Sequence, residues 1–352
     1  MASLTSMRDR AKPITVEERR ARIEKAQRLM TERGLDAILL TGGTSLLYFT
    51  AIRWSNSERL FGVVIPVKGA AFCVCPAFED DRAHEQLALG PLADAPVRLW
   101  QEDESPFERV AQGLAELGIR AGRLGIEETT TFVFGDSVAG AAPALKVTSA
   151  TPVTAGCRMI KDAHEIELMK LASAVTLKAY EAAFNAMKEG MTQNEFGGLV
   201  AAAHQKLGFP GSAGVQVGTY SALPHGSITP QVIREGSVLL IDGGCSVEGY
   251  QSDISRTFVL GKATDEMKKV FDIVHRAQSA ALMDGHEWPY LVKNNMFGWE
   301  QALNAQPGMV FSDEPGIYIR GSFGVRLEDD RHITPDGAEL FTPQSPSIEK
   351  PF

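Results

Sequence analysis

The chain has 352 residues, of which 44% are hydrophobic and 22% are charged, and it carries a formal net charge of −9 at pH 7. This length allows two domains that each bury a sizeable core. The acidic balance argues against a nucleic-acid partner and against an anionic membrane surface, and it is compatible with an enzyme of the cytoplasm.

We expect no targeting or membrane-spanning segment. The basic residues near the N-terminus are followed by no apolar stretch of the kind found in signal peptides. The apolar run at 61–78 is interrupted by proline, lysine and glycine, so it does not predict a transmembrane helix. Cys73 and Cys75 lie two positions apart in this run, where a strand would place both on one face. This spacing favours buried thiols over a metal site and indicates a reducing compartment.

Residues 1–155 are predicted to form an α/β domain. A capping box at Thr15 and Glu18 begins the first helix, which is expected to end at Gly34. The remaining pattern predicts strands at 37–41, 60–66, 70–74, 97–100 and 123–126, and helices at 77–89 and 106–117. Such an alternation is typical of α/β domains. Because no Gly-rich phosphate loop follows any of these strands, we expect no nucleotide site here.

The polar stretch from Arg53 to Arg59 admits two interpretations. It is either an exposed structural loop with a scattered tryptophan, or a segment that reaches toward an active site, its own or that of a dimer partner. In the second case Trp54 would contact substrate.

A second domain is predicted over residues 156–352, after an irregular segment at 151–157. A long helix begins at a capping box at 162–165 and extends to about 188. A second helix covers 192–207 and is capped by Thr192 and Glu195. Antiparallel strands are expected to follow. This half of the chain therefore predicts an α+β domain.

Two aspartates mark the ends of paired strands in the second domain. The runs Val238–Ile241 and Ile254–Leu260 read as strands joined by a Gly-rich reversal, with Asp242 leaving the first and Asp253 entering the second. Both could be ordinary turn residues. However, two carboxylates converging beside buried strands repel each other and raise each other's pKa unless a metal ion lies between them.

Two glutamates near the C-terminus occupy similar positions. Glu314 follows a strand-like run and precedes Pro315-Gly316, and Glu328 lies within another β-like run. Together with the two aspartates they make four acidic residues that each lie at or in a strand. Hard oxygen ligands in this number suit a divalent first-row metal, and bridging carboxylates suit a pair of metal ions.

Six motifs give the second half a specific resemblance. They are RMIKDAHEIELM (158–169), SALPHG (221–226), LLIDGGCSVEGYQSDISRTF (239–258), DGHEWPYL (284–291), DEPGIY (313–318) and VRLEDD (325–330). In this order they resemble the creatinase/aminopeptidase P/prolidase family of metallopeptidases. The resemblance implies an α/β N-terminal domain followed by an α+β catalytic domain of the pita-bread fold.

The resemblance also implies a metal site with two divalent ions, of manganese, cobalt or zinc. Asp242 would bind one ion, Asp253 and Glu328 would bridge both, and Glu314 would bind the second. Glu314 would also act as the general base for the attacking water.

Further residues would meet the substrate, which the resemblance implies is a dipeptide or short peptide with proline after the scissile bond. His225 and His286 would contact the scissile carbonyl and the developing oxyanion and would not bind metal. Arg326 and Trp54 would also contact substrate. The family further implies a homodimer.

One family element has no counterpart in this sequence. The family carries a metal-binding histidine in a Gly-His-Gly-Ile/Leu-Gly motif seven residues before the DGHE-type motif. Here Ser279–Met283 reads instead as the tail of a helix that begins near Asp265. We therefore predict that a segment with this histidine lies between Leu282 and Met283, and that these two residues are not bonded neighbours in the folded molecule.

Three functions follow from these observations and stay open. The first is metal-dependent hydrolysis of Xaa-Pro bonds, by a dipeptidase or an aminopeptidase. The second is a catalytically impaired pita-bread protein that serves as a binding or scaffold module, which the absent histidine favours. The third is hydrolysis of a non-peptide C–N bond, as in creatinase, or of an organophosphate ester.

Overall fold

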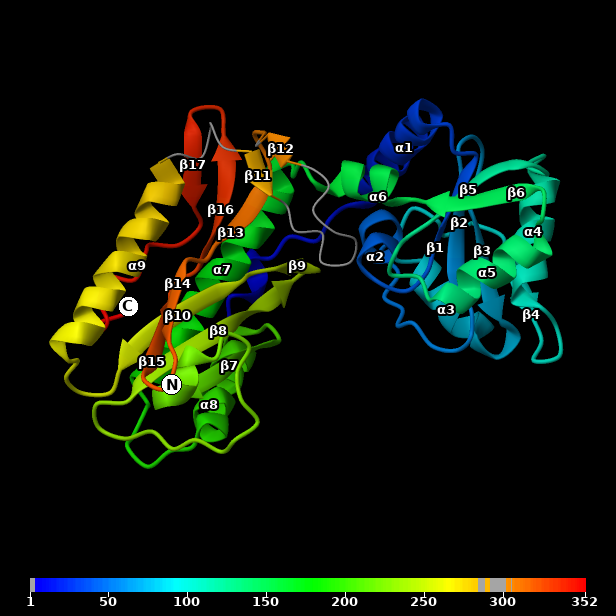
Figure 1. Ribbon diagram of the computed structural model, residues 1–352. Helices are drawn as coiled ribbons and strands as arrows, with labels where there is room; N and C mark the ends of the chain where they lie inside the picture. The colour runs from blue at the N-terminus through cyan, green and yellow to red at the C-terminus, as the bar shows by residue number, and fades with distance from the viewer. Residues whose placement is uncertain (1–3, 284–288, 292–301, 305) are drawn as a thin grey trace. The chain divides into compact units, whose positions relative to one another are not determined.

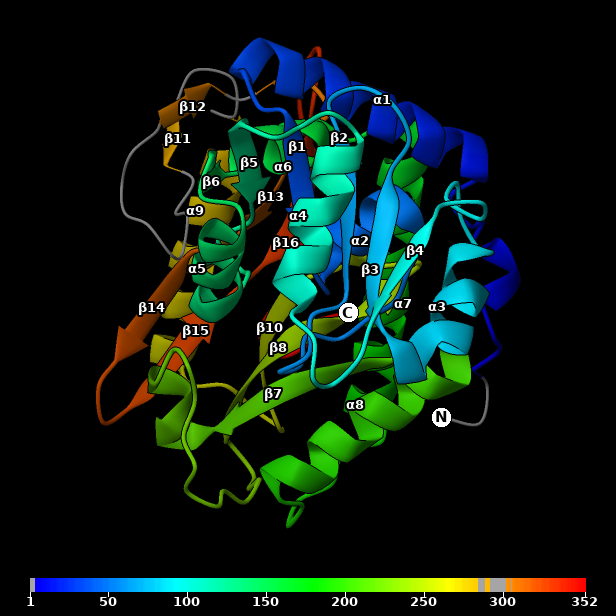
Figure 2. The same cartoon turned by 90° about the vertical axis from the view of Figure 1, so that its right-hand side faces the viewer.

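The computed structural model describes residues 4–283, 289–291, 302–304 and 306–352. They form two compact units, drawn in Figures 1 and 2. We call Ile14–Met159 the N-terminal unit, and residues 4–13 together with Ile160–Phe352 the C-terminal unit. Among the helices of the described residues, none is long and apolar enough to cross a membrane.

The N-terminal unit is built on one six-stranded mixed sheet in the order β4-β3-β2-β1-β5-β6. The strands are β1 (Ala37–Leu40), β2 (Gly62–Pro66), β3 (Phe72–Pro76), β4 (Val97–Trp100), β5 (Gly122–Ile126) and β6 (Leu145–Ser149). The helices are α1 (Val16–Arg33), α2 (Thr44–Thr50), α3 (Asp80–Leu87), α4 (Pro106–Glu116), α5 (Phe132–Ala141) and α6 (Thr151–Arg158). The predicted α/β domain is confirmed.

Both faces of the strands β1, β2 and β3 are buried, which explains why these strands are continuously apolar. Ile38 and Leu40 belong to one apolar cluster, whereas Ala37 and Leu39 belong to another. This alternation follows from the period of two along a strand.

The segment predicted to be irregular, at 151–157, is the helix α6. The prediction was wrong because Pro152 lies in the first helical turn, where its missing N–H is not needed. Gly156 lies where α6 meets α1: a Cβ there would come within 3.2 Å of Leu29 Cδ1. A glycine inside this helix therefore permits close packing.

The three capping boxes predicted from the sequence are present. At the start of α1, Thr15 Oγ1 accepts a hydrogen bond from the Glu18 N–H at 3.2 Å. Equivalent boxes begin α7 (Ala163–Phe184) and α8 (Gln193–Leu207), at Asp162 and Thr192. Each box satisfies N–H groups that have no partner within the helix.

The first half of the C-terminal unit packs α7 and α8 against an antiparallel sheet in the order β10-β8-β7. Its strands are β7 (Gly211–Val217), β8 (Val238–Val247), β9 (Tyr250–Gln251) and β10 (Ile254–Val259), with the short β9 paired to β8. In Figures 1 and 2 α8 lies along β7. Leu239 and Ile241 of β8 join Tyr180 of α7 and Phe196 of α8 in one apolar cluster.

The second half of this unit pairs short antiparallel strands beside α9 (Asp265–Met283), the yellow helix of Figure 1. The strands are β11 (Pro289–Leu291), β12 (Ala302–Asn304), β13 (Val310–Asp313), β14 (Gly316–Ile319), β15 (Phe323–Arg326), β16 (Asp329–Thr334) and β17 (Gly337–Leu340). They form the order β13-β16-β17 and the pairs β14-β15 and β11-β12. Phe271 and Val274 of α9 pack in one cluster with Val325 of β15.

The helix α9 contradicts the predicted discontinuity after Leu282. It runs from Asp265 through Leu282 to Met283, so these two residues are consecutive members of one helix. Its last turns are also tied to β16, because Arg331 Nη1 donates to the Ala281 carbonyl at 2.5 Å. The prediction that they are not neighbours was wrong, and any family segment lacking here is lacking from the chain itself.

Candidate metal centre

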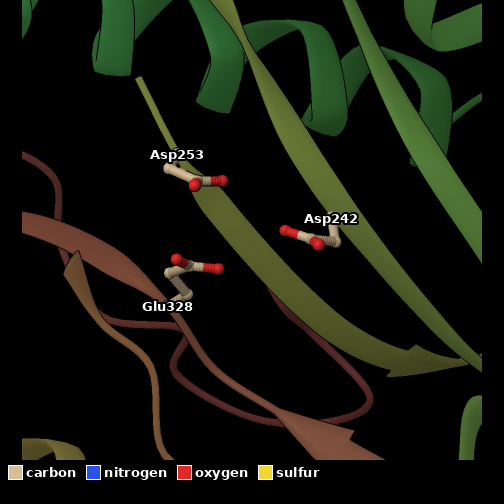
Figure 3. A group of neighbouring side chains, drawn as sticks. All are labelled: Asp242, Asp253 and Glu328. Atoms are coloured by element: carbon tan, nitrogen blue, oxygen red, sulfur yellow. The ribbon is translucent and has the colours of Figure 1, made fainter. Parts of the chain in front are cut away.

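Three carboxylates from three separate segments meet in the C-terminal unit (Figure 3). Asp242 lies in β8, Asp253 directly precedes β10, and Glu328 lies between β15 and β16. One ligand oxygen from each lies within 4.8 Å of the other two. The predicted convergence of Asp242 and Asp253 is thus present, and Glu328 joins them.

Local sequence explains how the two aspartates come together. β8 and β10 pair antiparallel, with Asp242 opposite Ser255, so Asp253 lies two residues before that pair. Gly244 follows Asp242 closely, and a Cβ on it would lie 1.8 Å from the Ser252 carbonyl oxygen. The glycine therefore lets the returning chain approach β8 and brings Asp253 beside Asp242.

A buried carboxylate holds the backbone of Asp253 in place. Asp330 Oδ2 accepts hydrogen bonds from the Asp253 N–H at 3.0 Å and from the Ser173 hydroxyl at 3.1 Å. Burial raises the pKa of Asp330 to about 7, and the two hydrogen bonds oppose that rise. Asp330 thus links helix α7 to the backbone at Asp253.

Ser255 lies between two of the three carboxylates. Its hydroxyl is 2.9 Å from Asp242 Oδ1 and 2.6 Å from Glu328 Oε2, and its one proton can be donated to only one of them. Arg326 Nε donates to the same hydroxyl oxygen at 3.0 Å. Asp253 and Ser255 are two positions apart on an extended segment, a spacing that places both side chains on one face and could have identified Ser255 from sequence.

Arg326, predicted to contact substrate, is turned toward the carboxylates. Its Nη2 forms an ion pair with Asp242 Oδ2 at 2.5 Å, and its Nη1 donates to Tyr318 Oη and to the Pro224 carbonyl, each at 3.2 Å. The Pro224 bond ties the SALPHG loop to the metal centre.

The electrostatics of the group favour a bound cation. Burial, together with the charges of Asp242 and Glu314, raises the pKa of Asp253 to about 6. Burial and the charge of Asp253 raise the pKa of Glu328 to about 9. A group of three carboxylates, two of them with raised pKa values, is the donor set that a hard divalent ion prefers, because its charge offsets both the repulsion and the lost hydration.

Glu314 lies outside this group of three within the described residues. It is exposed directly after β13, where the Ser312 hydroxyl donates to its Oε1 at 3.1 Å. Its charge nevertheless contributes to the raised pKa values of Asp253 and Glu328, so it is near enough to be felt electrostatically. The four-carboxylate site predicted from sequence is therefore assembled from three, with the fourth nearby.

The remaining predicted site residues are placed as follows. His225 is exposed in the loop after the short 3-10 helix Gly218–Ala222. It follows Pro224, whose carbonyl accepts the hydrogen bond from Arg326. His286 lies outside the described residues. Trp54, in the N-terminal unit, stacks on Phe61 with ring centroids 3.8 Å apart, and its ring lies under the Arg82 guanidinium at 4.0 Å.

Comparison with known proteins agrees with this architecture. The model of metallopeptidase family M24 matches residues 167–284 and 282–335, and that of the creatinase/prolidase N-terminal domain matches residues 22–160. The chain belongs to this metallopeptidase family. Its two-domain pita-bread fold is thereby confirmed, and the family implies divalent metal ions at the acidic group.

Three relatives illustrate the similarity. The putative dipeptidase YkvY of Bacillus subtilis is 26% identical over 91% of this chain and 97% of its own length. The Xaa-Pro dipeptidase of Lactobacillus helveticus is 24% identical over 91% of this chain and 96% of its own length. The crystal structure of a dipeptidase from Pyrococcus horikoshii OT3 matches 94% of this chain and 99% of its own, with 25% identity and a TM-score of 0.80.

These M24 relatives are longer than this chain in its interior. The alignment with YkvY has 369 positions but spans 91% of this chain, about 320 of its 352 residues, so about 49 positions have no residue here. The M24 match itself breaks into two parts that meet at 282–284. The break coincides with the end of α9, after which the family's metal-binding histidine has no counterpart in the sequence.

Proposed function

We propose that this M24 chain hydrolyses Xaa-Pro dipeptides or short peptides with a divalent metal held by Asp242, Asp253 and Glu328. The observation that carries the proposal is the meeting of these three carboxylates from three segments, with the raised pKa values of two of them. The printed name of the Lactobacillus helveticus relative supports the Xaa-Pro specificity. We propose a dipeptidase over an aminopeptidase because YkvY and the Pyrococcus structure also bear dipeptidase names.

Each residue has a part in this proposal. A divalent ion at the three carboxylates would polarise the scissile carbonyl and lower the pKa of a bound water. Glu314 is exposed directly after β13, and its charge acts on Asp253. It would therefore serve as the base that accepts a proton from the attacking water. His225 and His286 contact the scissile carbonyl oxygen and stabilise its developing charge.

We propose two metal ions, of manganese, cobalt or zinc. The second ion needs Glu314 beside Asp253 and Glu328. The described bond from Ser312 to Glu314 is exposed, so exchanging it for a metal contact costs little. Metal content per chain, measured by inductively coupled plasma mass spectrometry after equilibration with Mn²⁺, distinguishes one ion from two.

Substrate selection follows from the chemistry of proline. The imide nitrogen of an Xaa-Pro bond carries no N–H, so a site that offers no acceptor at that position prefers it to an ordinary peptide. We propose that Arg326 and Trp54 contact the peptide. Arg326 would do so as a fixed cation, since Ser255 and Asp242 hold its guanidinium.

The function is tested with the purified chain supplied with Mn²⁺, Co²⁺ or Zn²⁺. Hydrolysis of Ala-Pro is compared with that of Ala-Ala, Ala-Pro-Gly, creatine and an organophosphate ester. We expect Ala-Pro to be cleaved and the activity to disappear with EDTA and return with metal. Cleavage of Ala-Ala at the same rate would refute the proline specificity.

A second candidate function is a binding module with impaired catalysis. It is favoured by the roughly 49 alignment positions that this chain lacks and by the position of Glu314 outside the carboxylate group. If Mn²⁺ binds and no substrate of the panel is cleaved, while a Lactobacillus helveticus Xaa-Pro dipeptidase cleaves Ala-Pro in parallel, this second function replaces the first.

We further propose a homodimer in a reducing cytoplasm, with the chain divided functionally into residues 1–155 and 156–352. The four cysteines are all free and buried, which supports the reducing compartment. Light scattering coupled to size exclusion tests the oligomeric state.

A further inference from the structure

Few backbone hydrogen bonds join the strand β10 to the segment that carries the proposed metal ligand Glu328. Within the described part of the chain, β10 pairs with β8 on one side, and it meets residues 326–328 through a single isolated bridge between Ser255 and Glu328. One backbone bond, from the Glu328 N–H to the Ser255 carbonyl at 3.2 Å, makes this bridge. The position of Glu328 therefore depends on side chains.

Three consecutive side chains of β10 bind residues 326–328 through hydrogen bonds. Thr257 Oγ1 donates to the Arg326 carbonyl at 2.8 Å and accepts from the Arg326 N–H at 3.0 Å. Ser255 reaches the Glu328 carboxylate itself. Arg256 Nη1 donates to two carbonyl oxygens, of Ser255 at 3.0 Å and of Glu328 at 2.9 Å. Of these three side chains, Arg256 is the one that donates to the backbone carbonyls of both bridged residues.

Arg256 is itself fixed by a fully buried partner. Its Nη2 donates to Asp329 Oδ1 at 2.7 Å and to the Pro343 carbonyl at 3.0 Å, and both charged side chains have no exposed surface. Asp329 also accepts from the Thr342 hydroxyl at 2.6 Å and from Gln278 Nε2 at 2.9 Å. Asp329 directly follows Glu328, so its contacts hold the chain next to the residue that would bind metal.

Gln278 connects this network to the end of α9. It lies five residues before Met283, where the family match breaks, and it also donates to the Asp313 carbonyl at 3.4 Å. Asp329 directly follows Glu328 and thus couples the last turns of α9, near the break in the family match, to the segment that carries Glu328.

We propose that Arg256 and Asp329 are positioning residues that set the place of the Glu328 carboxylate opposite Asp242 and Asp253, and with it the affinity for a divalent ion. The inference rests on the proposed metal site. A buried ion pair is a poor source of stability, because desolvation offsets most of its attraction. The planar fork of arginine, however, can hold several acceptors at fixed angles, which a lysine cannot.

The test compares Arg256→Lys with the unchanged protein by titrating Mn²⁺ into the metal-free full chain in a calorimeter. We expect the dissociation constant to rise about 10–100-fold, the range typical of residues that orient metal ligands. Asp329→Asn is expected to weaken Mn²⁺ binding in the same direction. Far-UV circular dichroism and the thermal midpoint of the metal-free form are recorded for each variant.

Arg19→Lys is the matched control. Arg19 is a buried arginine of the N-terminal unit that donates to the carbonyl oxygens of Leu47 and Tyr48. Its replacement is expected to lower the thermal midpoint while the Mn²⁺ dissociation constant stays unchanged. A purely structural role for Arg256 predicts this same outcome, a lower midpoint with unchanged Mn²⁺ affinity, and that result would overturn the proposal.

Two milder variants keep the test decisive if Arg256→Lys does not fold. Thr342→Val and Gln278→Leu each remove one donor to Asp329 and leave the ion pair in place, and each is expected to weaken Mn²⁺ binding several-fold. Unchanged affinity in both would refute the inference, as would a wild-type chain that binds no divalent ion. If wild-type protein binds Mn²⁺ but cleaves no peptide, the proposed function fails while the positioning role stands on the affinity data.

Discussion

The two units of this chain bury charge in opposite ways. In the N-terminal unit the buried charged residues are Arg19 and Arg22. Among the described residues of the C-terminal unit they are Glu165, Arg256, Asp313, Arg326, Glu328, Asp329, Asp330 and Arg331. Both units have large apolar clusters, so the difference does not reflect the lack of a core.

The surroundings of these charges differ as well as their number. Arg19 and Arg22 donate to the Tyr48 carbonyl, and the Arg22 guanidinium lies 4.0 Å from the centre of the Tyr48 ring. Carbonyl oxygens and an aromatic ring are thus among the partners of these arginines. In the C-terminal unit burial and neighbouring carboxylates instead raise the pKa values of Asp253 and Glu328. The buried charges of the N-terminal unit are thus stabilised by groups of the fold itself. In the C-terminal unit a bound cation would stabilise the ionised forms of the buried carboxylates.

The largest expected effect is on activity, from removing one carboxylate. Asp253→Ala should lower hydrolysis of Ala-Pro at least about a hundredfold to a thousandfold, because it takes away a ligand shared by the proposed ions. It should not lower the thermal midpoint of the metal-free protein, since one of three repelling groups is gone. Steady-state kinetics and calorimetry measure the two quantities.

The control for this variant is Asp81→Ala, an exposed aspartate of the N-terminal unit. It should leave both activity and metal binding unchanged. Full hydrolysis by Asp253→Ala would end the metal mechanism, and a large loss of metal-free stability would show that the cluster is structural.

The second effect is a pH dependence confined to the C-terminal unit. Asp253 has a pKa of about 6 against a usual 3.8, and Glu328 has a pKa of about 9 against a usual 4.5. Because the fold favours the protonated forms, the stabilisation they give is complete below pH 4 and is lost as the pH rises through 6 and then 9. A bound cation favours the ionised forms and should remove this loss.

Denaturant unfolding between pH 5 and 9, with EDTA and with Mn²⁺, tests this prediction. Metal-free stability should fall with rising pH, and the fall should be smaller with Mn²⁺. Glu328→Gln carries no titrating group at this position and should flatten the metal-free profile above pH 7, beyond the raised pKa values of Asp253 and Asp330. A metal-free profile that rises over this range would contradict the assigned direction.

A third, intermediate effect concerns His225. His225→Ala should lower the turnover of Ala-Pro about a hundredfold and leave the Mn²⁺ content per chain unchanged, because we assign this exposed loop residue to the substrate carbonyl. His84→Ala, at an exposed histidine of the N-terminal unit, is the control and should change neither. Loss of metal in the His225 variant would refute the assignment.

Sequence reasoning succeeded where the signal is local. The capping boxes at Thr15, Asp162 and Thr192 are each contained in four residues, and all three begin helices. Asp242 and Asp253 are likewise visible in one hairpin, and the structure brings them together, although Asp242 lies within β8 and not at the end of a strand as predicted. Local chemistry of this kind depends on neighbours in the chain, so a single sequence is enough to predict it.

It failed where the partners are distant. Arg256 and Asp329 are 73 residues apart, and nothing near either position predicts that they form a buried pair. The position of Glu314 outside the group depends on the path of the chain between β13 and β14, which no periodicity specifies. The helix at 151–158 was missed because Pro152 and Gly156 usually mark loops, and only the packing against α1 explains the glycine.

The smallest predicted effect compares the same device in both units. Thr15→Ala and Thr192→Ala each remove an N-cap hydroxyl, and each should lower the free energy of unfolding by about 1 kcal/mol. The first acts in the N-terminal unit and the second in the C-terminal unit, where Mn²⁺ adds a stabilisation that grows with its concentration. If the units unfold separately, the metal should raise only the transition that Thr192→Ala lowers. Scanning calorimetry with and without Mn²⁺ resolves the two transitions. A single transition that responds equally to both caps and to metal would mean that the units unfold together, and the contrast between them would then be one of chemistry and not of stability.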